Sequence, residues 1–239
     1  LHLLVQWYNK LKQTTLEVEA PLIKVEIENV DRQINRAETE LTWQDQNCWN
    51  YICTLKDTVY KLERRVQKSK DNVEMMEVLM NGWSKQPMLC RKDHKKESTL
   101  QLDDRAARVA KTYNNLRKDG ETIHNLLQEN LILLAADSSS DAWKAYLEYV
   151  DDMVVEGFFS AVSTSLEFFI ENMEGSLRQA PLFEAQMLLM GSEIKFKPSL
   201  DRDDGDGLYE LVEELLGDVF KMSAQVKRVA PHLSVEDYQ

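Results

Sequence analysis

One stretch of the sequence repeats apolar residues at intervals that alternate between four and three over 36 residues. Ten of its eleven positions are apolar or cysteine, Ser69 being the exception. Such spacing keeps a single stripe of a helix facing a partner helix. The stripe consists of Cys48, Ile52, Leu55, Val59, Leu62, Val66, Ser69, Val73, Met76, Met80 and Trp83. It predicts a continuous helix of about 54 Å, at about 1.5 Å per residue.

A second stripe with the same alternation follows after an interruption. Pro87 and the charged residues 91–96 separate the two stripes and predict a loop. Two stripes of similar length around one loop predict an antiparallel helical hairpin, at about 43–84 and 101–135. The second stripe consists of Leu102, Ala106, Val109, Tyr113, Leu116, Gly120, Ile123, Leu127, Asn130 and Leu134.

The residues before the first stripe predict two shorter amphipathic helices, at 1–16 and 22–41. Pro21 suits the first position of the second helix, where its missing N–H is tolerated. Thr42 and Asp45 have the spacing of a weakened capping box, which predicts the start of the long helix.

Residues 141–173 predict another helix, and Ser140 is a suitable N-cap for it. Its apolar residues cover more than one stripe, which is typical of a helix in the middle of a bundle. We therefore expect the core to centre on this helix.

Near 182–197 the pattern changes from helical spacing to strict alternation, with Gly191-Ser192 at the middle. This predicts a β-hairpin. An acidic loop at 201–207 and an amphipathic helix at 208–229 follow. The alternating residues are Phe183, Ala185, Met187, Leu189, Ile194 and Phe196.

The predicted fold class is mainly α, an elongated bundle of long antiparallel helices with one short β-hairpin near 182–197. Only 8 Gly and 5 Pro in 239 residues suit long helices. The expected division is a helical bundle at 1–136, continued at 137–239 by the buried central helix, the hairpin and the last helix.

Charge is spread unevenly along the chain. Residues 1–100 hold 16 Lys/Arg against 15 Asp/Glu, and residues 101–239 hold 13 against 26. The acidic part disfavours nucleic acid and anionic lipid. Glu156 and Glu167 interrupt the most apolar stretch, so we expect no membrane-spanning helix. Three cysteines form no disulfide framework, which indicates a cytoplasmic protein.

No motif for nucleotide binding or nucleophilic catalysis occurs, so the sequence predicts no catalytic residue and no small-molecule substrate. Calcium binding at 201–207 is disfavoured because Arg202 occupies the first ligand position. Zinc is disfavoured because Cys90 and His94 lack the tighter paired spacing of zinc ligands. We predict no cofactor and no metal.

Basic residues gather on the first long helix, and the loop at 91–96 adds to them. The simplest interpretation is a solvated face paired with Glu63 and Asp71. A protein-docking strip is the alternative, and nucleic acid is disfavoured because no aromatic residues interleave with the charges. The basic residues are Lys61, Arg64, Arg65, Lys68 and Lys70.

Several long phrases resemble the heavy-chain stem of axonemal dyneins, with the outer-arm, beta-type chains most similar. Together they span nearly the whole chain, as packing patterns rather than catalytic signatures. The phrases are PLIKVEIENVDRQINRAETELTW (21–43), RVQKSKDNVE (65–74), NGW and RKD around Trp83 and Arg91, LDDRAARVAKTYNNLRKDGETIHNLLQEN (102–130), WKAYLEYVDDMVVEGFFSAVSTSLEFFIENM (143–173) and PLFEAQMLLMGSEIKFKPSLD (181–201).

This resemblance implies a piece of a longer polypeptide, a microtubule motor ATPase of the ciliary or flagellar axoneme. Its ATPase ring would lie outside the piece, which would form a stem segment just N-terminal to the force-producing linker. The implied function is to transmit force between cargo-binding tail and motor. The implied partners are a neighbouring heavy chain and intermediate or light chains. The alternatives are part of the linker itself, or an unrelated coiled-coil scaffold.

Overall fold

The computed structural model describes most of the chain, apart from eight short gaps and the last ten residues. The side chains of residues 105, 106 and 220–229 are also outside the description. The described residues are 1–42, 47–85, 88–92, 99–100, 102, 105–173, 179–203, 205 and 207–229.

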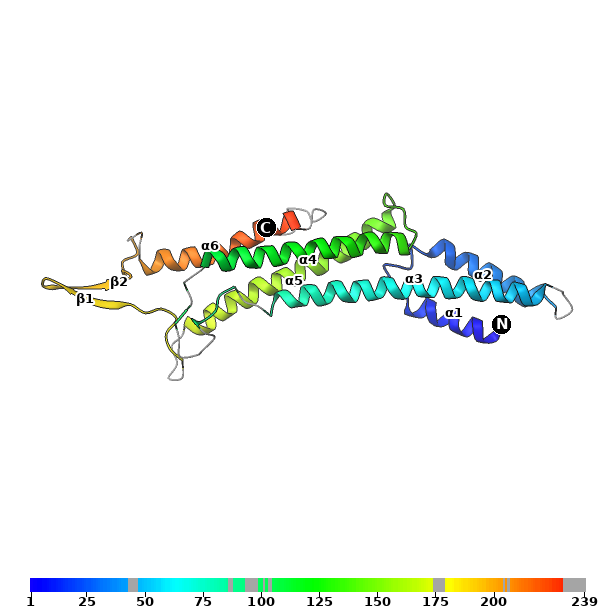
Figure 1. Ribbon diagram of the computed structural model, residues 1–239, viewed down its shortest axis with the longest axis horizontal. Helices are drawn as coiled ribbons and strands as arrows, with labels where there is room; N and C mark the ends of the chain where they lie inside the picture. Colours follow the sequence, from blue (N-terminus) through cyan, green and yellow to red (C-terminus); the bar gives the residue numbers. More distant parts are fainter. Residues whose placement is uncertain are drawn as a thin grey trace. The chain divides into compact units, whose positions relative to one another are not determined.

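The regular elements among the described residues are six helices and one two-stranded antiparallel sheet (Figure 1). The prediction of a mainly α chain with a single hairpin is confirmed. The elements are α1 (His2–Thr14), α2 (Lys24–Thr39), α3 (Cys48–Trp83), α4 (Arg105–Leu133), α5 (Asp141–Met173), β1 (Gln186–Met190), β2 (Glu193–Lys197) and α6 (Leu208–Val229).

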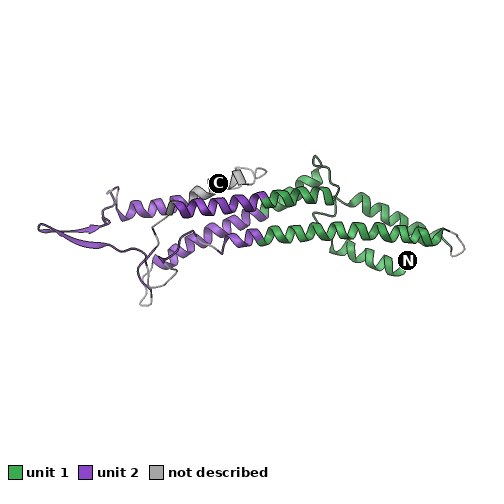
Figure 2. Ribbon diagram, in the orientation of Figure 1, with its two compact units in different colours: residues 1–78, 122–152 green, residues 79–121, 153–239 purple. Residues whose placement is uncertain are grey.

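The chain divides into two compact units, shown in different colours in Figure 2. Unit 1 consists of residues 1–78 and 122–152, and unit 2 consists of residues 79–121 and 153–239. Each unit therefore combines segments that are distant in sequence, and α3, α4 and α5 each contribute to both. The division of the chain after residue 136 stays a prediction.

The first stripe is buried along α3, as its spacing predicts. None of its positions is exposed, and only Cys48, Ile52 and Trp83 are partly buried. Val59 is 0% exposed, whereas Val78 on the same helix is 64% exposed and lies off the stripe. The fully buried positions are Leu55, Val59, Leu62, Val66, Ser69, Val73, Met76 and Met80.

The second stripe is buried in the C-terminal part of α4, from Leu116 to Leu134. Inside unit 1, Asn72 of α3 contacts Asn130 of α4, and inside unit 2, Trp83 donates to Asp119. The later residue of α3 meets the earlier residue of α4, so the helices run antiparallel. The predicted antiparallel arrangement of long helices is confirmed, and the bounds of the hairpin stay a prediction.

The end of α4 is closed by a backbone motif. The N–H of Ala136 donates to the Leu131 carbonyl at 3.0 Å, and the N–H of Ala135 donates to Ile132 at 3.1 Å. Ala135 has φ 48, the left-handed conformation that such a motif requires. Glycine is the usual residue there because a Cβ atom is strained at this φ.

The N-terminal helices complete unit 1. Leu4, Tyr8 and Leu11 of α1 are buried, and the Tyr8 hydroxyl donates to the Ile27 carbonyl of α2 at 2.9 Å. Helix α2 begins at Lys24, so the placement of Pro21 at a first helical position is wrong. Pro21 lies in the turn before the helix. The predicted capping residue Asp45 lies outside the described residues.

Unit 2 has an apolar core built from short segments and two helices. Helix α5 contributes Phe169 and α6 contributes Leu215 and Val219, together with Leu89, Leu100 and Leu182 from the connections. A Cβ atom on Gly157 of α5 would lie 2.9 Å from the Met80 Cβ of α3. The two helices thus approach more closely than a larger residue at this position permits.

The expectation that α5 is buried on most sides is wrong. Its buried residues follow one stripe, and Phe159, Ile170 and Met173 are 71%, 66% and 60% exposed. The broad apolar composition of α5 therefore divides into a core stripe and an exposed apolar stripe. The core stripe consists of Trp143, Tyr146, Val150, Val154, Phe158, Ser165 and Phe169.

Candidate interaction surface

The residues considered for metal binding do not gather in the structure. Cys48, Cys53 and Cys90 are partly buried and form no disulfide, and the Cys90 sulfur accepts a hydrogen bond from Arg108. Across the described ranges, no group of three His, Cys, Asp or Glu side chains could hold a metal ion. His94, Asp204 and Asp206 lie outside these ranges. The absence of a catalytic, cofactor or metal site stays a prediction.

Three of the five basic residues of α3 contact other helices of unit 1, namely Arg65, Lys68 and Lys70, whereas Lys61 and Arg64 are exposed. The Arg65 guanidinium makes a two-pronged contact with the Glu26 carboxylate of α2, at 2.9 and 2.8 Å. Its Nε also donates to the carbonyl of Leu133, the last residue of α4, at 2.5 Å. A cation at this position complements the negative end of the α4 helix dipole. One side chain therefore connects three helices of unit 1 through charge-assisted bonds.

The expected pairing of this basic run with Glu63 and Asp71 is wrong. Glu63 accepts a hydrogen bond from the Trp7 indole of α1, and Asp71 accepts one from Gln67. The local i,i+4 spacing predicted partners on the same helix. The observed partner of Lys68 is Glu129 on α4, at 3.9 Å. Sequence spacing carried no signal for these contacts because their partners are distant in the chain.

Arg91 was expected in a solvated loop, but it is only 5% exposed. Its guanidinium donates to Asn172 Oδ1 at 3.2 and 3.0 Å and to the Ala180 carbonyl at 2.8 Å. These bonds satisfy a buried cation within unit 2. The contribution of Arg91 to an exposed positive strip is therefore excluded. Residues 93–96 of that loop lie outside the described residues.

A buried polar cluster lies inside unit 1, and the sequence analysis did not identify it. Asn130 is central to it, accepting from Asn72 at 2.7 Å and donating to the Tyr146 hydroxyl at 2.8 Å. Ser69 donates to the Glu19 carboxylate at 2.6 Å. The cluster connects the turn before α2 with α3, α4 and α5. Ser69 and Asn130 were the only sequence signals, as polar residues on apolar stripes.

Burial alters the titration of this cluster. Desolvation raises the pKa of Glu19 above its ordinary value of 4.5, against the opposing effects of the Ser69 bond, the Leu16 backbone and Lys70. Desolvation likewise raises the pKa of Tyr146 to about 12. Glu19 Oε2 is buried and has no hydrogen-bond partner. The environment therefore favours the neutral forms of both groups.

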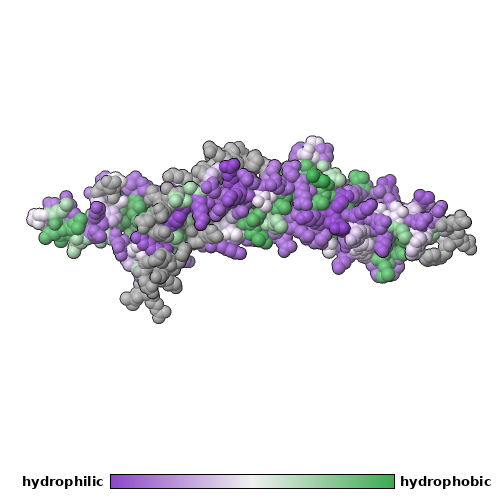
Figure 3. Space-filling view, viewed as in Figure 1, coloured by the Kyte–Doolittle hydropathy of each residue, from purple (hydrophilic) through white to green (hydrophobic). Residues whose placement is uncertain are grey.

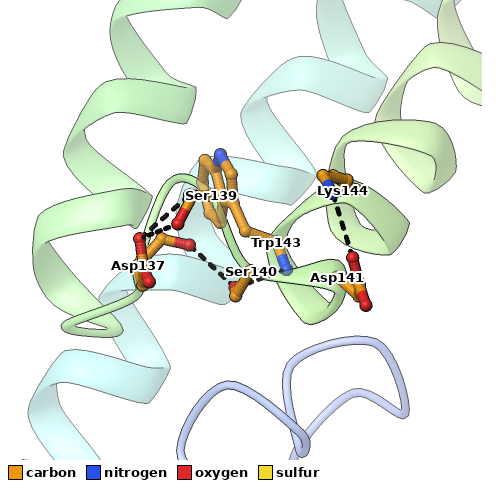
Figure 4. Close-up of polar contacts among 6 residues, drawn as sticks. All are labelled: Asp137, Ser139, Ser140, Asp141, Trp143 and Lys144. Carbon is orange, nitrogen blue, oxygen red and sulfur yellow. Dashed lines mark hydrogen bonds and ion pairs between the residues drawn. The ribbon is translucent and has the colours of Figure 1, made fainter.

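The start of α5 is closed by the predicted residue (Figure 4). Ser140 Oγ accepts from the Trp143 N–H at 3.2 Å, which satisfies one free donor of the first turn. The Asp137 carboxylate accepts from the backbone N–H and the hydroxyl of Ser139, at 2.9 and 2.8 Å. These two bonds lower the pKa of Asp137. The Ser140 N-cap is confirmed.

The hairpin is unusual because its strands are exposed to solvent on both faces. Every residue of β1 and β2 is exposed, although the strands pair in full register. Four apolar residues share one side of the ribbon, because directly paired residues lie on the same face. Figure 3 shows strongly hydrophobic residues gathered at the hairpin. We name this side the apolar hairpin face: Met187 and Phe196 form one pair, and Leu189 and Ile194 form the next.

Helix α5 carries further exposed apolar side chains of unit 2, Phe159, Ile170 and Met173. By length and composition α5 could cross a membrane, so excluding it on the charges of Glu156 and Glu167 alone is too strict. Ser165 on its buried side is 1% exposed and accepts from the Met88 N–H at 3.1 Å. This side of the helix packs against protein. The expectation of no membrane contact stays a prediction.

The chain is similar to known proteins along its entire length. Residues 1–51 match the family described as dynein heavy chain, N-terminal region 1. Aligned over all 239 residues, the chain is 49% identical to dynein axonemal heavy chain 11 of Sus scrofa. It is 47% identical over the same length to the ciliary dynein beta chain of Tripneustes gratilla. The match to the flagellar outer-arm dynein beta chain of Chlamydomonas reinhardtii is 26% identical over 96% of this chain. The chain spans 5% of the length of each of these relatives.

Proposed function

Because this chain is homologous along its whole length to axonemal dynein heavy chains, we propose that it is a structural segment of a heavy-chain stem. The relatives are axonemal, ciliary and flagellar proteins, which indicates a location at the axoneme in the cytoplasm of cilia or flagella. Within the stem, the segment transmits force between the cargo-binding tail and the ATPase motor.

The observation that carries this proposal is the continuous burial of the α3 stripe. A helix of 36 residues without an exposed stripe position has packing partners along its whole length. Side chains also join elements within each unit, since Arg65 joins three helices in unit 1 and Arg91 joins two connecting segments to α5 in unit 2. Such crosslinked helices resist bending, which a force-transmitting element requires.

We assign no enzymatic activity to the segment itself, since the motor's ATPase would lie elsewhere in the heavy chain. Addition of ATP is then expected to leave the melting temperature of the 239-residue chain unchanged. A clear increase would reveal nucleotide binding, because a ligand that binds only the folded state stabilises it. GTP serves as the control for nonspecific effects of nucleotide and ionic strength.

Docking of neighbouring dynein subunits is the second part of the proposed function. The exposed stripe of Phe159, Ile170 and Met173 on α5 supports it, because soluble surfaces rarely expose large apolar side chains in a row. Replacing Phe159 and Ile170 by Ser is expected to reduce copurification of intermediate or light chains with the heavy chain. Serine at the exposed Val25 of α2 is the matched control. Unchanged subunit content would contradict this part.

The mechanical part is tested in the full heavy chain with Val59→Asp, which disrupts the α3 stripe. Microtubule-activated ATPase per motor is expected to stay unchanged, while the force sustained in an optical trap falls by at least half. Val78→Asp on the exposed side of α3 is the control. An equal loss of ATPase and force would contradict a role limited to transmission. Unchanged force with a melted unit 1 would exclude the segment from the force path.

A further inference from the structure

The apolar hairpin face is an unusual surface for a two-stranded ribbon. Met187, Leu189, Ile194 and Phe196 are 67%, 74%, 60% and 41% exposed. On the opposite face, β2 presents Glu193, Lys195 and Lys197, and β1 presents Gln186, Leu188 and Met190. Only the apolar hairpin face is therefore apolar on both strands, whereas the opposite face mixes charged and apolar side chains.

The turn shows that the ribbon is a formed element rather than two extended segments. Gly191 has φ +68 and joins strands through a two-residue loop with Ser192. A positive φ at the first loop residue is the feature of a type II′ turn, whose twist matches paired strands. Isolated two-stranded hairpins are at best marginally stable in water without a packing partner. A covering element would supply the missing stabilisation.

The size of the face restricts which partner can cover it. Large apolar side chains bury about 200 Å² each, so the exposed parts of these four amount to roughly 500 Å². A stable complex between separate chains buries about 800 Å² on each partner. The face is therefore too small to hold a second copy of this chain or another diffusing protein alone. A tethered partner meets a much higher effective concentration and needs less contact area.

The relatives provide such a tethered partner. The 239 residues correspond to 5% of their length, so nearly all of a related heavy chain lies outside the matched stretch. A helix also fits the face geometrically. The two apolar pairs lie two residues apart along each strand, about 7 Å, and residues i and i+4 of a helix rise about 6 Å. An apolar helical stripe can therefore contact both pairs.

We propose that the apolar hairpin face docks an apolar helical stripe from another part of the same heavy chain. This inference rests on the proposed function for the identity of the longer chain. It assigns the hairpin to an intrachain junction, in contrast to the α5 stripe, which we assign to other subunits.

The test places a photoreactive residue on each face of the hairpin in the full heavy chain. p-Benzoylphenylalanine at Leu189 is expected to crosslink to a helix outside these 239 residues of the same polypeptide, as mapped by mass spectrometry. The same probe at Lys195 lies on the opposite face and is expected to give at least tenfold fewer such crosslinks. Both positions are exposed, so neither substitution removes a core side chain.

Other crosslinking outcomes would overturn the proposal. These are a product with a different polypeptide, with a second heavy chain or with lipid, and equal yields from the two faces. Absence of a product from Leu189 would also overturn it. These results are separable from failure of the force-transmission proposal, because crosslinking does not depend on motor output.

Hydrogen exchange in the full heavy chain gives an independent measurement. Leu189→Asp is expected to speed amide exchange in β1 and β2 by at least tenfold, because the covering helix no longer packs on the face. Lys195→Asp is expected to leave these rates within about twofold of the wild type. Equal rates in Leu189→Asp and wild-type chains would show that nothing covers the apolar hairpin face.

Discussion

The two units differ in what they place inside and outside. Unit 1 buries a polar cluster, including Glu19, Asn72 and Asn130, and joins its helices through Arg65. The identified core cluster of unit 2 is apolar, whereas its hairpin and part of α5 expose large apolar side chains. Unit 1 thus places a set of specific polar contacts in its interior. Unit 1 also exposes large apolar side chains, such as Leu3, Trp49 and Ile132, but in unit 2 four of them share one face of a β-ribbon.

The largest expected effect on the free energy of unfolding comes from a charge placed in the core of unit 1. Val59→Asp buries a carboxylate without a partner at a position that is 0% exposed, which costs about 3–5 kcal/mol. Circular dichroism of the 239-residue chain is expected to show a much lower melting temperature. Val78→Asp on the same helix is the control, and its effect is expected within about 0.5 kcal/mol. Wild-type melting of Val59→Asp would contradict the assigned stripe.

A smaller effect is expected in unit 2 from a single added methyl group. Gly157→Ala places a Cβ atom 2.9 Å from the Met80 Cβ, and such overpacking costs about 1–3 kcal/mol. Gly217→Ala in α6 is the matched control, because nothing lies within 4 Å of its added Cβ. Gly217→Ala is expected to raise the free energy of unfolding by about 0.5–1 kcal/mol, because alanine favours a helix more than glycine does. Similar denaturant midpoints for the two variants would refute a close approach of α3 and α5.

The buried carboxylate of unit 1 predicts a dependence on pH. Burial raises the pKa of Glu19, so the folded chain holds this proton more tightly than the unfolded chain does. The stabilisation from this proton is present below the ordinary pKa of 4.5 and is lost as pH rises through the folded value. Glu19→Gln keeps a neutral side chain and is expected to add about 1 kcal/mol at neutral pH.

Urea unfolding at about pH 4 and about pH 8 checks this expectation. The difference between Glu19→Gln and the wild type should be larger at the higher pH. Glu17→Gln, two residues earlier and exposed, is the control. A difference that is independent of pH would show that Glu19 does not titrate as its burial implies.

The smallest expected effect concerns the end of α4. Ala135 has φ 48, so Ala135→Gly removes strain and is expected to stabilise unit 1 by about 0.5–1 kcal/mol. Ala136→Gly, whose φ is not in the left-handed region, is the matched control and should be neutral or destabilising. Thermal unfolding can resolve the pair, and stabilisation by both substitutions would contradict the cap.

Periodic contacts were predictable from sequence, and contacts between distant residues were not. The stripe of α3, the Ser140 N-cap and the Gly191 turn each depend on neighbouring residues, and all three were confirmed. The Ser69–Glu19 bond joins residues 50 positions apart, and Arg65 reaches Leu133 across 68. Such partners follow from tertiary packing, which local spacing does not encode.

Apolar composition alone also did not indicate whether a residue is buried or exposed within this chain. The apolar residues of α5 predicted burial, yet Phe159 of α5 is among the most exposed apolar side chains, as is Leu189 of the hairpin. A sequence pattern identifies a face that avoids water, but it does not identify which molecule covers that face. Only the arrangement of the chain separates internal core from exposed surface.

The pairing of Asn72 with Asn130 has a consequence for sliding between α3 and α4. The apolar stripes alone would permit a shift of the helices by one heptad, since each repeat resembles the next. Such a shift would place both amides against apolar side chains and break bonds of 2.7 and 2.8 Å. The hydrogen-bonded pair therefore favours a single alignment of α3 and α4. Under tension it would oppose shear between the two helices.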